Sequence, residues 1–251
     1  MRIVVIGASG LIGSNVAAKL EEHGHEVVPA SPNSGVNTLT GEGLADAMQG
    51  AQVVVDVSNS PSFADDDVME FFETSTRNLL DAEKAAGVTH HVALSVVGAE
   101  RMPDSGYLRA KCRQEELIRD SGVPYSIIHA TQFFEFGARI ADAATEGETV
   151  RIPHVLFQPI AAEDVARAVG RTAAGAPLNG VVEIGGPEQF RFDEFIRDAL
   201  AAKADPRKVV VDPDARSFGT TLTERSLVPG DGAQLGEIRF EDWLRQPAAA
   251  R

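Results

Sequence analysis

The chain has 251 residues and carries 37 acidic against 23 basic side chains, and the resulting net charge of −14 argues against nucleic acid or an anionic membrane as its partner. A single cysteine, Cys112, excludes an intramolecular disulfide and a cysteine-based zinc site, and we expect no metal centre. Because no apolar run reaches the roughly 18 residues of a membrane span and no signal segment precedes the first predicted strand, we expect a cytoplasmic protein.

A glycine-rich turn follows the first predicted strand. The apolar run Ile3–Ile6 has strand length, three glycines follow with two residues between each, and a helical pattern comes next. Gly7 would let the strand turn sharply, Gly10 would let a pyrophosphate approach the backbone, and Gly13 would let the helix pack close to the strand. Free N–H groups and the helix dipole would then face the phosphates. We therefore predict a dinucleotide site formed by Gly7, Ser9, Gly10, Leu11, Ile12 and Gly13.

The loop after the second predicted strand, His25–Pro29, bears on which dinucleotide fits. An acidic residue there would hold the free ribose hydroxyls of NAD, and the loop has none. It offers Ser31, Asn33 and Ser34, which are small donors able to surround a 2′-phosphate, without an Arg or Lys nearby. This pattern favours NADP(H) over NAD(H), and the alternative is an ordinary polar turn.

Strands and helices alternate as far as residue 130. Such alternation predicts an α/β fold of the Rossmann type, a doubly wound parallel sheet with helices on both faces. Ligands of these sheets lie at the carboxyl ends of the strands, so Val57 and Ser58, where the third strand ends, are expected to contact the cofactor. The expected helices are 14–22, 41–50, 69–86 and 107–119, and the later strands are 52–57, 90–97 and 124–130.

Beyond Thr131 the regularity loosens. We expect a single NAD(P)-binding domain over residues 1–251, in which roughly 131–160 and 187–251 form a small C-terminal substrate lobe. Gln132 and Phe133 follow the fifth strand and are the candidate substrate contacts. The expected elements are helices over 132–145, 163–174, 193–203 and 240–244, one or two strands in 149–160, strands over 181–184 and 208–211, and a frayed tail at 246–251.

Tyr107 and Lys111 stand four residues apart on a predicted helix, which puts the phenol and the ammonium on one face. A cation beside a phenol would lower the pKa of the phenol from roughly 10, as an acid or base working near neutrality requires. Lys111 would also donate to the ribose hydroxyls of the cofactor. The alternative is a chance pair on a solvated helix.

Six motifs, spread over nearly the whole chain, share one resemblance. They are G-A-S-G-L-I-G from Gly7, L-S-V-V-G-A-E from Leu94, Y-L-R-A-K from Tyr107, I-I-H-A-T-Q-F-F from Ile127, Q-P-I-A-A-E-D-V-A from Gln158 and V-E-I-G-G-P-E from Val182. Together they resemble the short-chain dehydrogenase/reductase superfamily, and most closely its atypical NmrA-like or NAD(P)H-binding branch. The resemblance implies Tyr107 as proton donor, Lys111 as ribose anchor and Ser95 as the group that steadies the substrate carbonyl. It also implies that Asp164 caps its helix.

These observations predict an NAD(P)H-dependent oxidoreductase of the short-chain dehydrogenase/reductase type. It would reduce a carbonyl, quinone or enone of a small organic molecule by hydride transfer, and it would be a monomer or a homodimer. One alternative is a non-catalytic redox sensor that binds NADP(H) and reports to a partner. A sugar-nucleotide epimerase or dehydratase is a further alternative, ranked lower because only about 100 residues follow the fifth strand.

Overall fold

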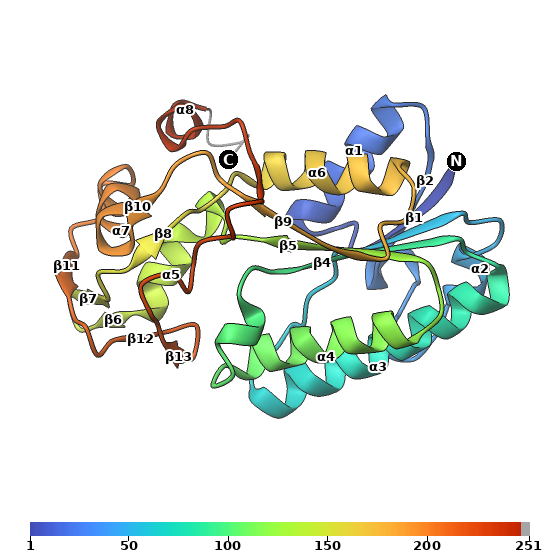
Figure 1. Cartoon of the computed structure of the whole chain (residues 1–251), viewed down its shortest axis with the longest axis horizontal. Helices are drawn as coiled ribbons and strands as arrows, with labels where there is room; N and C mark the ends of the chain where they lie inside the picture. The colour runs from blue at the N-terminus through green and yellow to red at the C-terminus, as the bar shows by residue number, and fades with distance from the viewer. Residues whose placement is uncertain (247–251) are drawn as a thin grey trace.

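The computed structural model describes residues 1–246, and within them a parallel sheet of seven strands forms the centre of the molecule (Figure 1). Its strands are β1 (Arg2–Ile6), β2 (Glu26–Ala30), β3 (Val53–Asp56), β4 (His90–Val96), β5 (Tyr125–Ala130), β9 (Gly180–Gly185) and β14 (Gln234–Leu235). They lie in the order β14-β9-β5-β4-β3-β1-β2, and each neighbouring pair is parallel. The chain changes direction across the sheet between β1 and β3, which is where a ligand crevice opens in doubly wound sheets.

Helices cover both faces of this sheet. Helices α1 (Leu11–Glu22) and α6 (Ala162–Ala174) lie on one face, and α3 (Asp65–Ala86) and α4 (Gly106–Asp120) lie on the other (Figure 1). The predicted doubly wound α/β fold is therefore confirmed. Helix α3 begins four residues earlier than predicted, because its first turn is built from three aspartates, whose carboxylates are favoured at a helix N-terminus. The short α2 (Leu44–Ala47) occupies the middle of the predicted 41–50 helix.

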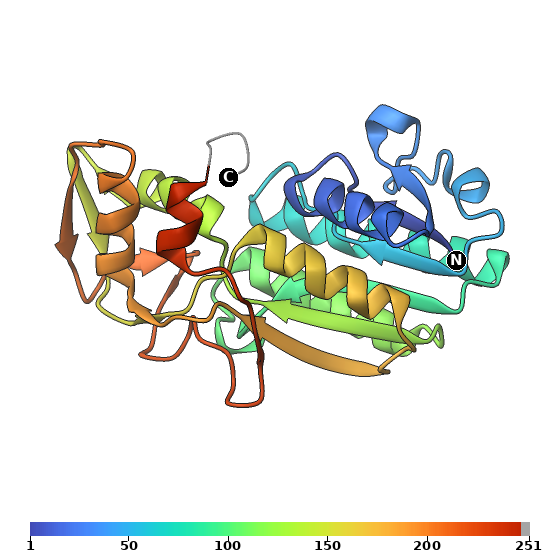
Figure 2. The same ribbon diagram turned by 90° about the horizontal axis from the view of Figure 1, so that it is seen from above.

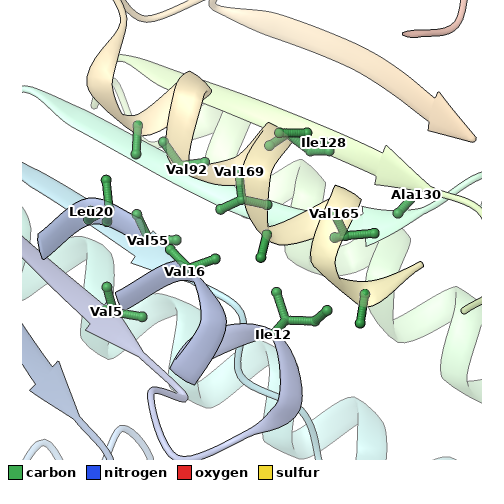
Figure 3. Close-up of a cluster of buried hydrophobic side chains, with 14 of the residues drawn as sticks. Val5, Ile12, Val16, Leu20, Val55, Val92, Ile128, Ala130, Val165 and Val169 are labelled. Carbon is green, nitrogen blue, oxygen red and sulfur yellow. The ribbon is translucent and has the colours of Figure 1, made fainter. Parts of the chain in front are cut away.

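Aliphatic side chains fill the space between the sheet and the α1–α6 layer. Figure 3 shows Val16 of α1 and Val165 and Val169 of α6 in one buried cluster with Val5 and Val55 of the sheet. All five are fully buried. Burial of this kind stabilises a fold by about 1.5–3 kcal/mol per large aliphatic side chain, and it fixes the orientation of the turn that precedes α1.

A second lobe stands beyond the carboxyl edge of the sheet (Figure 2). Its core is aromatic, with Phe134, Phe195 and Phe240 packed ring against ring at 4.6–6.2 Å between centroids. No helix in the described range combines the length and the apolar character that a membrane span requires. The elements of the lobe are α5 (Gly137–Ala143), β6 (Thr145–Glu146), β7 (Thr149–Ile152), β8 (Leu156–Phe157), β10 (Phe190–Arg191), α7 (Phe192–Ala201), β11 (Lys208–Val211), β12 (Arg216–Ser217), β13 (Thr220–Thr221) and α8 (Phe240–Arg245).

The predicted helix over 132–145 is only partly present. The backbone of Ile160 donates to Gln132 and accepts from Phe134, so Gln132 and Phe133 are not helical and pair with a distant segment. A 3₁₀ turn then leads into α5, which begins at Gly137. Long-range pairing has overridden the local helical pattern. The predicted tail lies outside the described residues from 247 onward.

The segment before α8 is tied to the sheet through Asp164. Its carboxylate accepts the backbone N–H groups of Glu237 and Ile238 at 2.9 and 2.8 Å, instead of capping α6 as the resemblance implied. The N-cap of α6 is Ala161, whose side chain has no acceptor. Asp164 thus fastens the C-terminal segment beside β14, a strand that was not predicted.

Candidate active site

A cavity of about 1300 Å³ lies between the carboxyl edge of the sheet and the C-terminal lobe. It exceeds the roughly 300–1,000 Å³ typical of a site for one small ligand, so it has room for a cofactor and a substrate together. Most of the predicted site residues line it. These are Gly7, Ser9, Gly10, Leu11, Ile12, Ser31, Val57, Ser58, Ser95, Tyr107, Lys111, Gln132 and Phe133.

The glycine turn forms one wall of the cavity without side chains. Gly7 has φ +82°, and a Cβ there would lie 2.9 Å from the backbone of Ser58, so the turns after β1 and β3 touch directly. A Cβ on Gly13 would lie 2.1 Å from the carbonyl oxygen of Gly7. Gly13 therefore lies behind the turn, outside the cavity lining, and lets α1 pack against it. Gly10 is the N-cap of α1 and, in the described structure, gives no side-chain cap, which leaves the first N–H groups of α1 available to an anion.

The predicted 2′-phosphate donors are only partly brought together. Ser31 lines the cavity, whereas Asn33 and Ser34 do not. The Ser34 hydroxyl is used within its own 3₁₀ turn, where it accepts the backbone N–H of Ser31 at 2.9 Å and lies within donating distance of Pro29 O. The following loop was not predicted to be part of the site, but its residues Asn37, Thr38 and Leu39 also line the cavity.

Tyr107 lies where α4 meets the cavity, surrounded by aromatic rings. Its ring centroid is 5.5 Å from that of Phe63 and 6.0 Å from that of Phe72. Burial raises the pKa of Tyr107 to about 12, so the predicted lowering by a neighbouring cation is wrong for the free protein. The phenol is therefore neutral near pH 7 and holds a proton. Its hydroxyl makes no hydrogen bond to any residue within 1–246, so that proton is free for a ligand.

Lys111 lies on the same face of α4 as Tyr107, since both contact Phe72. Its ammonium sits 4.4 Å from the centroid of that ring, donates to Leu94 O at 2.9 Å and donates to the side-chain oxygen of Gln114. Gln114 in turn donates to Asp56 at 2.9 Å. Burial lowers the pKa of Lys111 to about 8, against the pull of the Asp56 carboxylate. The lysine is held in place by the protein before any ligand arrives.

Asp56 and Gln114 were missed by sequence reasoning. Asp56 also accepts the backbone N–H and the hydroxyl of Ser58 at 3.0 and 2.6 Å, so a single carboxylate orients both the β3 turn and, through Gln114, Lys111. A signal was present, because Asp56 is an acid inside an otherwise apolar strand and Gln114 lies three residues after Lys111.

The Ser95 hydroxyl is already hydrogen-bonded within the protein. Its hydroxyl donates to Glu115 at 2.5 Å, and Glu115 is also paired with His129 at 2.8 Å and Arg119 at 2.6 Å. Burial disfavours the charge of Glu115, yet the hydrogen bonds from His129 and Ser95 keep its pKa below the usual range. Ser95 lines the cavity, but its proton is directed into this buried cluster instead of toward a ligand.

The residues after β5 bring unpartnered polar atoms to the cavity. The Thr131 hydroxyl and the Gln132 side-chain oxygen are buried and have no hydrogen-bond partner among the described residues. Both residues line the cavity, beside Phe133. Buried polar atoms without partners are costly, so these two mark a place where a ligand would satisfy them. The part of the chain that the structure describes holds no group of three or more His, Cys, Asp or Glu side chains arranged for a metal ion.

Two curated proteins are similar to this chain over most of its length. A (4-alkanoyl-5-oxo-2,5-dihydrofuran-3-yl)methyl phosphate reductase from Streptomyces griseus is 26% identical, over 99% of this chain and 98% of its own length. The chloroplastic divinyl chlorophyllide a 8-vinyl-reductase of Oryza sativa subsp. indica is 28% identical over 74% of this chain, and the match spans 54%, about half, of that protein.

Among solved structures, the NADPH-dependent quinone oxidoreductase QOR2 of Escherichia coli, complexed with NADPH, superposes with a TM-score of 0.65 and 21% identity, covering 84% of this chain and 77% of that one. At that identity the likeness concerns the fold. The sequence model for NAD(P)H-binding proteins matches residues 7–174, which include the glycine turn, Tyr107 and Lys111. The resemblance to the NmrA-like branch of the short-chain dehydrogenases/reductases is thus confirmed, and the chain belongs to the NAD(P)H-binding family.

Proposed function

We propose that this protein is an NAD(P)H-dependent reductase of a carbonyl, quinone or enone in a small organic molecule. The observation that carries the proposal is the neutral Tyr107 phenol, which has a free proton and faces the same cavity as the glycine turn. The names of the relatives, a vinyl-reductase, a dihydrofuranone phosphate reductase and a quinone oxidoreductase, support a reduction.

The residues fit a dinucleotide. The uncapped start of α1 would receive the pyrophosphate at the N–H groups of Leu11 and Ile12, and Ser31 would lie beside the adenosine ribose. Lys111 would donate to the second ribose. When bound, the reduced nicotinamide supplies a hydride from C4 to the substrate carbon. Gln132 would lie beside the nicotinamide, where its unpartnered oxygen would find a donor.

Tyr107 would complete the reduction by giving its proton to the substrate oxygen that gains negative charge. Lys111, charged below its pKa of about 8, would favour the resulting phenolate. The phenol would then regain a proton from solvent. The rings of Phe72, which is fully buried, and of Phe133, which lines the cavity, would give the reacting atoms an apolar environment. For the dinucleotide we propose NADP(H) over NAD(H), because the lining includes Ser31 and no acidic residue of the β2 loop.

The test is the oxidation of NADPH and of NADH, followed by absorbance, over a panel of ketones, quinones and enones. The proposal predicts turnover with at least one substrate class and a higher kcat/KM with NADPH. Tight binding of the dinucleotide with no turnover over the whole panel would contradict it and would favour the redox-sensor alternative.

A further inference from the structure

We propose that Arg139 and Arg216 bind an oxyanion, a phosphate or carboxylate group, on the substrate. This inference rests on the proposed reductase function and specifies its substrate class. Both arginines line the large cavity from the lobe side, Arg139 on α5 and Arg216 on β12.

The first argument is the lack of an acidic partner. In a chain of net charge −14, nearly every arginine within residues 1–246 makes an ion pair. In that range only Arg139, Arg171 and Arg216 make none, and two of these three face the same cavity. Among the described residues that line the cavity, the one carboxylate is that of Asp65, and it is already paired with Arg109 at 2.7 Å.

The second argument is that both guanidinium groups are anchored without being neutralised. Arg139 lies 5.4 Å from the centroid of the Phe136 ring, which packs at 5.2 Å on the ring of Phe133, three residues after β5. A cation over a ring face keeps its charge and its hydrogen-bond donors. Arg139 is therefore held beside the expected nicotinamide end of the cavity.

Arg216 is positioned by the β12–β13 hairpin. Its guanidinium donates to Gly219 O at 2.5 Å across the turn, and Phe218 and Gly219 adopt the left-handed φ values of +54° and +80° that such a turn needs. The turn touches the start of α4, since a Cβ on Gly219 would lie 3.6 Å from Ser105, two residues before Tyr107. Arg216 thus belongs to the wall next to the predicted proton donor.

Guanidinium is the group best suited to an oxyanion, because its fork of donors matches two oxygens at once. Two unpaired arginines at the substrate end, together with a charged Lys111, would attract an anionic substrate and disfavour a cationic one. A phosphate monoester and a carboxylate share this chemistry, and the experiment separates them.

The experiment is isothermal titration of the protein–NADPH complex with phenyl phosphate, benzoate and benzyl alcohol. The proposal predicts that at least one oxyanion binds about tenfold or more tightly than the alcohol, and that Arg139→Ala and Arg216→Ala each weaken that binding about tenfold. If phenyl phosphate binds more tightly than benzoate, the oxyanion on the substrate is a phosphate. If benzoate binds more tightly, it is a carboxylate.

The matched control is Arg171→Ala. Arg171 is the third unpaired arginine, but it lies on α6 beside a separate small cavity of about 30 Å³. Its loss should leave probe binding unchanged. Equal affinity for oxyanion and alcohol, or an equal effect of Arg171→Ala, would overturn the proposal. So would variants that weaken NADPH binding alone, because the arginines would then hold the dinucleotide.

Failure of the reductase function would be visible separately. Suppose that no substrate in the panel is reduced, while oxyanions still bind more tightly than the alcohol and this preference still depends on Arg139 and Arg216. The oxyanion site would then be supported and the proposed reaction contradicted. If NADPH were oxidised equally well with anionic and neutral substrates, and the arginine variants did not change KM, the reaction would stand and this site would fall.

Discussion

The two walls of the cavity are built in opposite ways. The sheet wall is made of backbone, with a glycine turn after β1, the uncapped start of α1 and the β3 turn held by Asp56. The lobe wall is made of side chains carried by short elements that return from distant parts of the sequence, such as α5 and the β12–β13 hairpin.

The contrast teaches that the two binding tasks are separable. A backbone wall recognises what all dinucleotides share, their phosphates, and tolerates little change of shape. A side-chain wall can be altered one residue at a time, so we propose that substrate choice resides there. Variants on the sheet wall should therefore affect cofactor affinity and folding, and variants on the lobe wall should affect the substrate alone. The cavity is also lined by Tyr107 and Lys111 of α4 and by Ser95 of β4, which belong to neither wall.

Replacement of Tyr107 by Phe should have the largest effect. Loss of the proton donor should lower kcat about 100- to 10,000-fold, while the Kd for NADPH stays unchanged, because Phe keeps the packing of the ring and the hydroxyl makes no hydrogen bond within residues 1–246. Steady-state kinetics and fluorescence titration measure the two quantities. Tyr125→Phe, at the only other tyrosine, is the control. A kcat within threefold of wild type would exclude Tyr107 as the donor.

Lys111 should make stability depend on pH. Its folded pKa of about 8 lies below its ordinary 10.5, so the unfolded chain binds more protons between these values. The cost of burying the charged lysine is fully present below pH 8 and is relieved as pH rises toward 10.5. The free energy of unfolding should therefore rise across this window by up to about 3 kcal/mol relative to Lys111→Met, at about 1.4 kcal/mol per pKa unit. Urea unfolding at a series of pH values measures this free energy. The same pH dependence in wild type and in Lys111→Met would contradict the lowered pKa of Lys111.

On the sheet wall, Gly13→Ala should disturb the turn itself. The new Cβ would meet Gly7 O at 2.1 Å, and such overpacking costs about 1–3 kcal/mol of stability. NADPH binding should weaken at the same time, because the N–H groups of α1 shift. Thermal unfolding and fluorescence titration measure both. Gly180→Ala is the control, since its nearest neighbour would be 3.7 Å away, and an equal loss there would argue against a special role for Gly13.

Ser95→Ala should have the smallest effect on catalysis. The hydroxyl donates to Glu115, so its loss should lower stability by about 1 kcal/mol and leave kcat within threefold. Ser126→Ala removes a buried strand hydroxyl outside the cavity lining and should behave alike. If Ser95 instead steadied a substrate carbonyl, kcat would fall at least tenfold with little change in melting temperature.

The sheet could be predicted from the sequence because its signals are local. The apolar runs around Val4, Val54 and Val92 and the glycines between them mark strands and turns without knowledge of the rest of the chain. The lobe could not be predicted in the same way. Residues 132–134 have a helical pattern, but their backbone pairs with Ile160. One strand of the sheet was missed as well, because β14 has only two residues and its place depends on Asp164, some seventy residues earlier.

The candidate site divides along the same line. Tyr107 and Lys111 were predicted together because a spacing of four residues on a helix defines a shared face, and in the structure both contact Phe72. The pKa of Tyr107 was predicted in the wrong direction, because burial by neighbouring rings is not visible in the sequence. Arg139 and Arg216 were not predicted, because their lack of an acidic partner within residues 1–246 is visible only in the structure.

The most direct test of the proposed reaction is transfer of deuterium from NADPH labelled at C4 of the nicotinamide, on either face, to the best substrate of the panel. Mass spectrometry would locate the label in the product. The proposed mechanism predicts one deuterium bound to carbon for one of the two labelled faces, and a large loss of product formation in Tyr107→Phe with that label position unchanged. Tight NADPH binding with no deuterium in any product would contradict it.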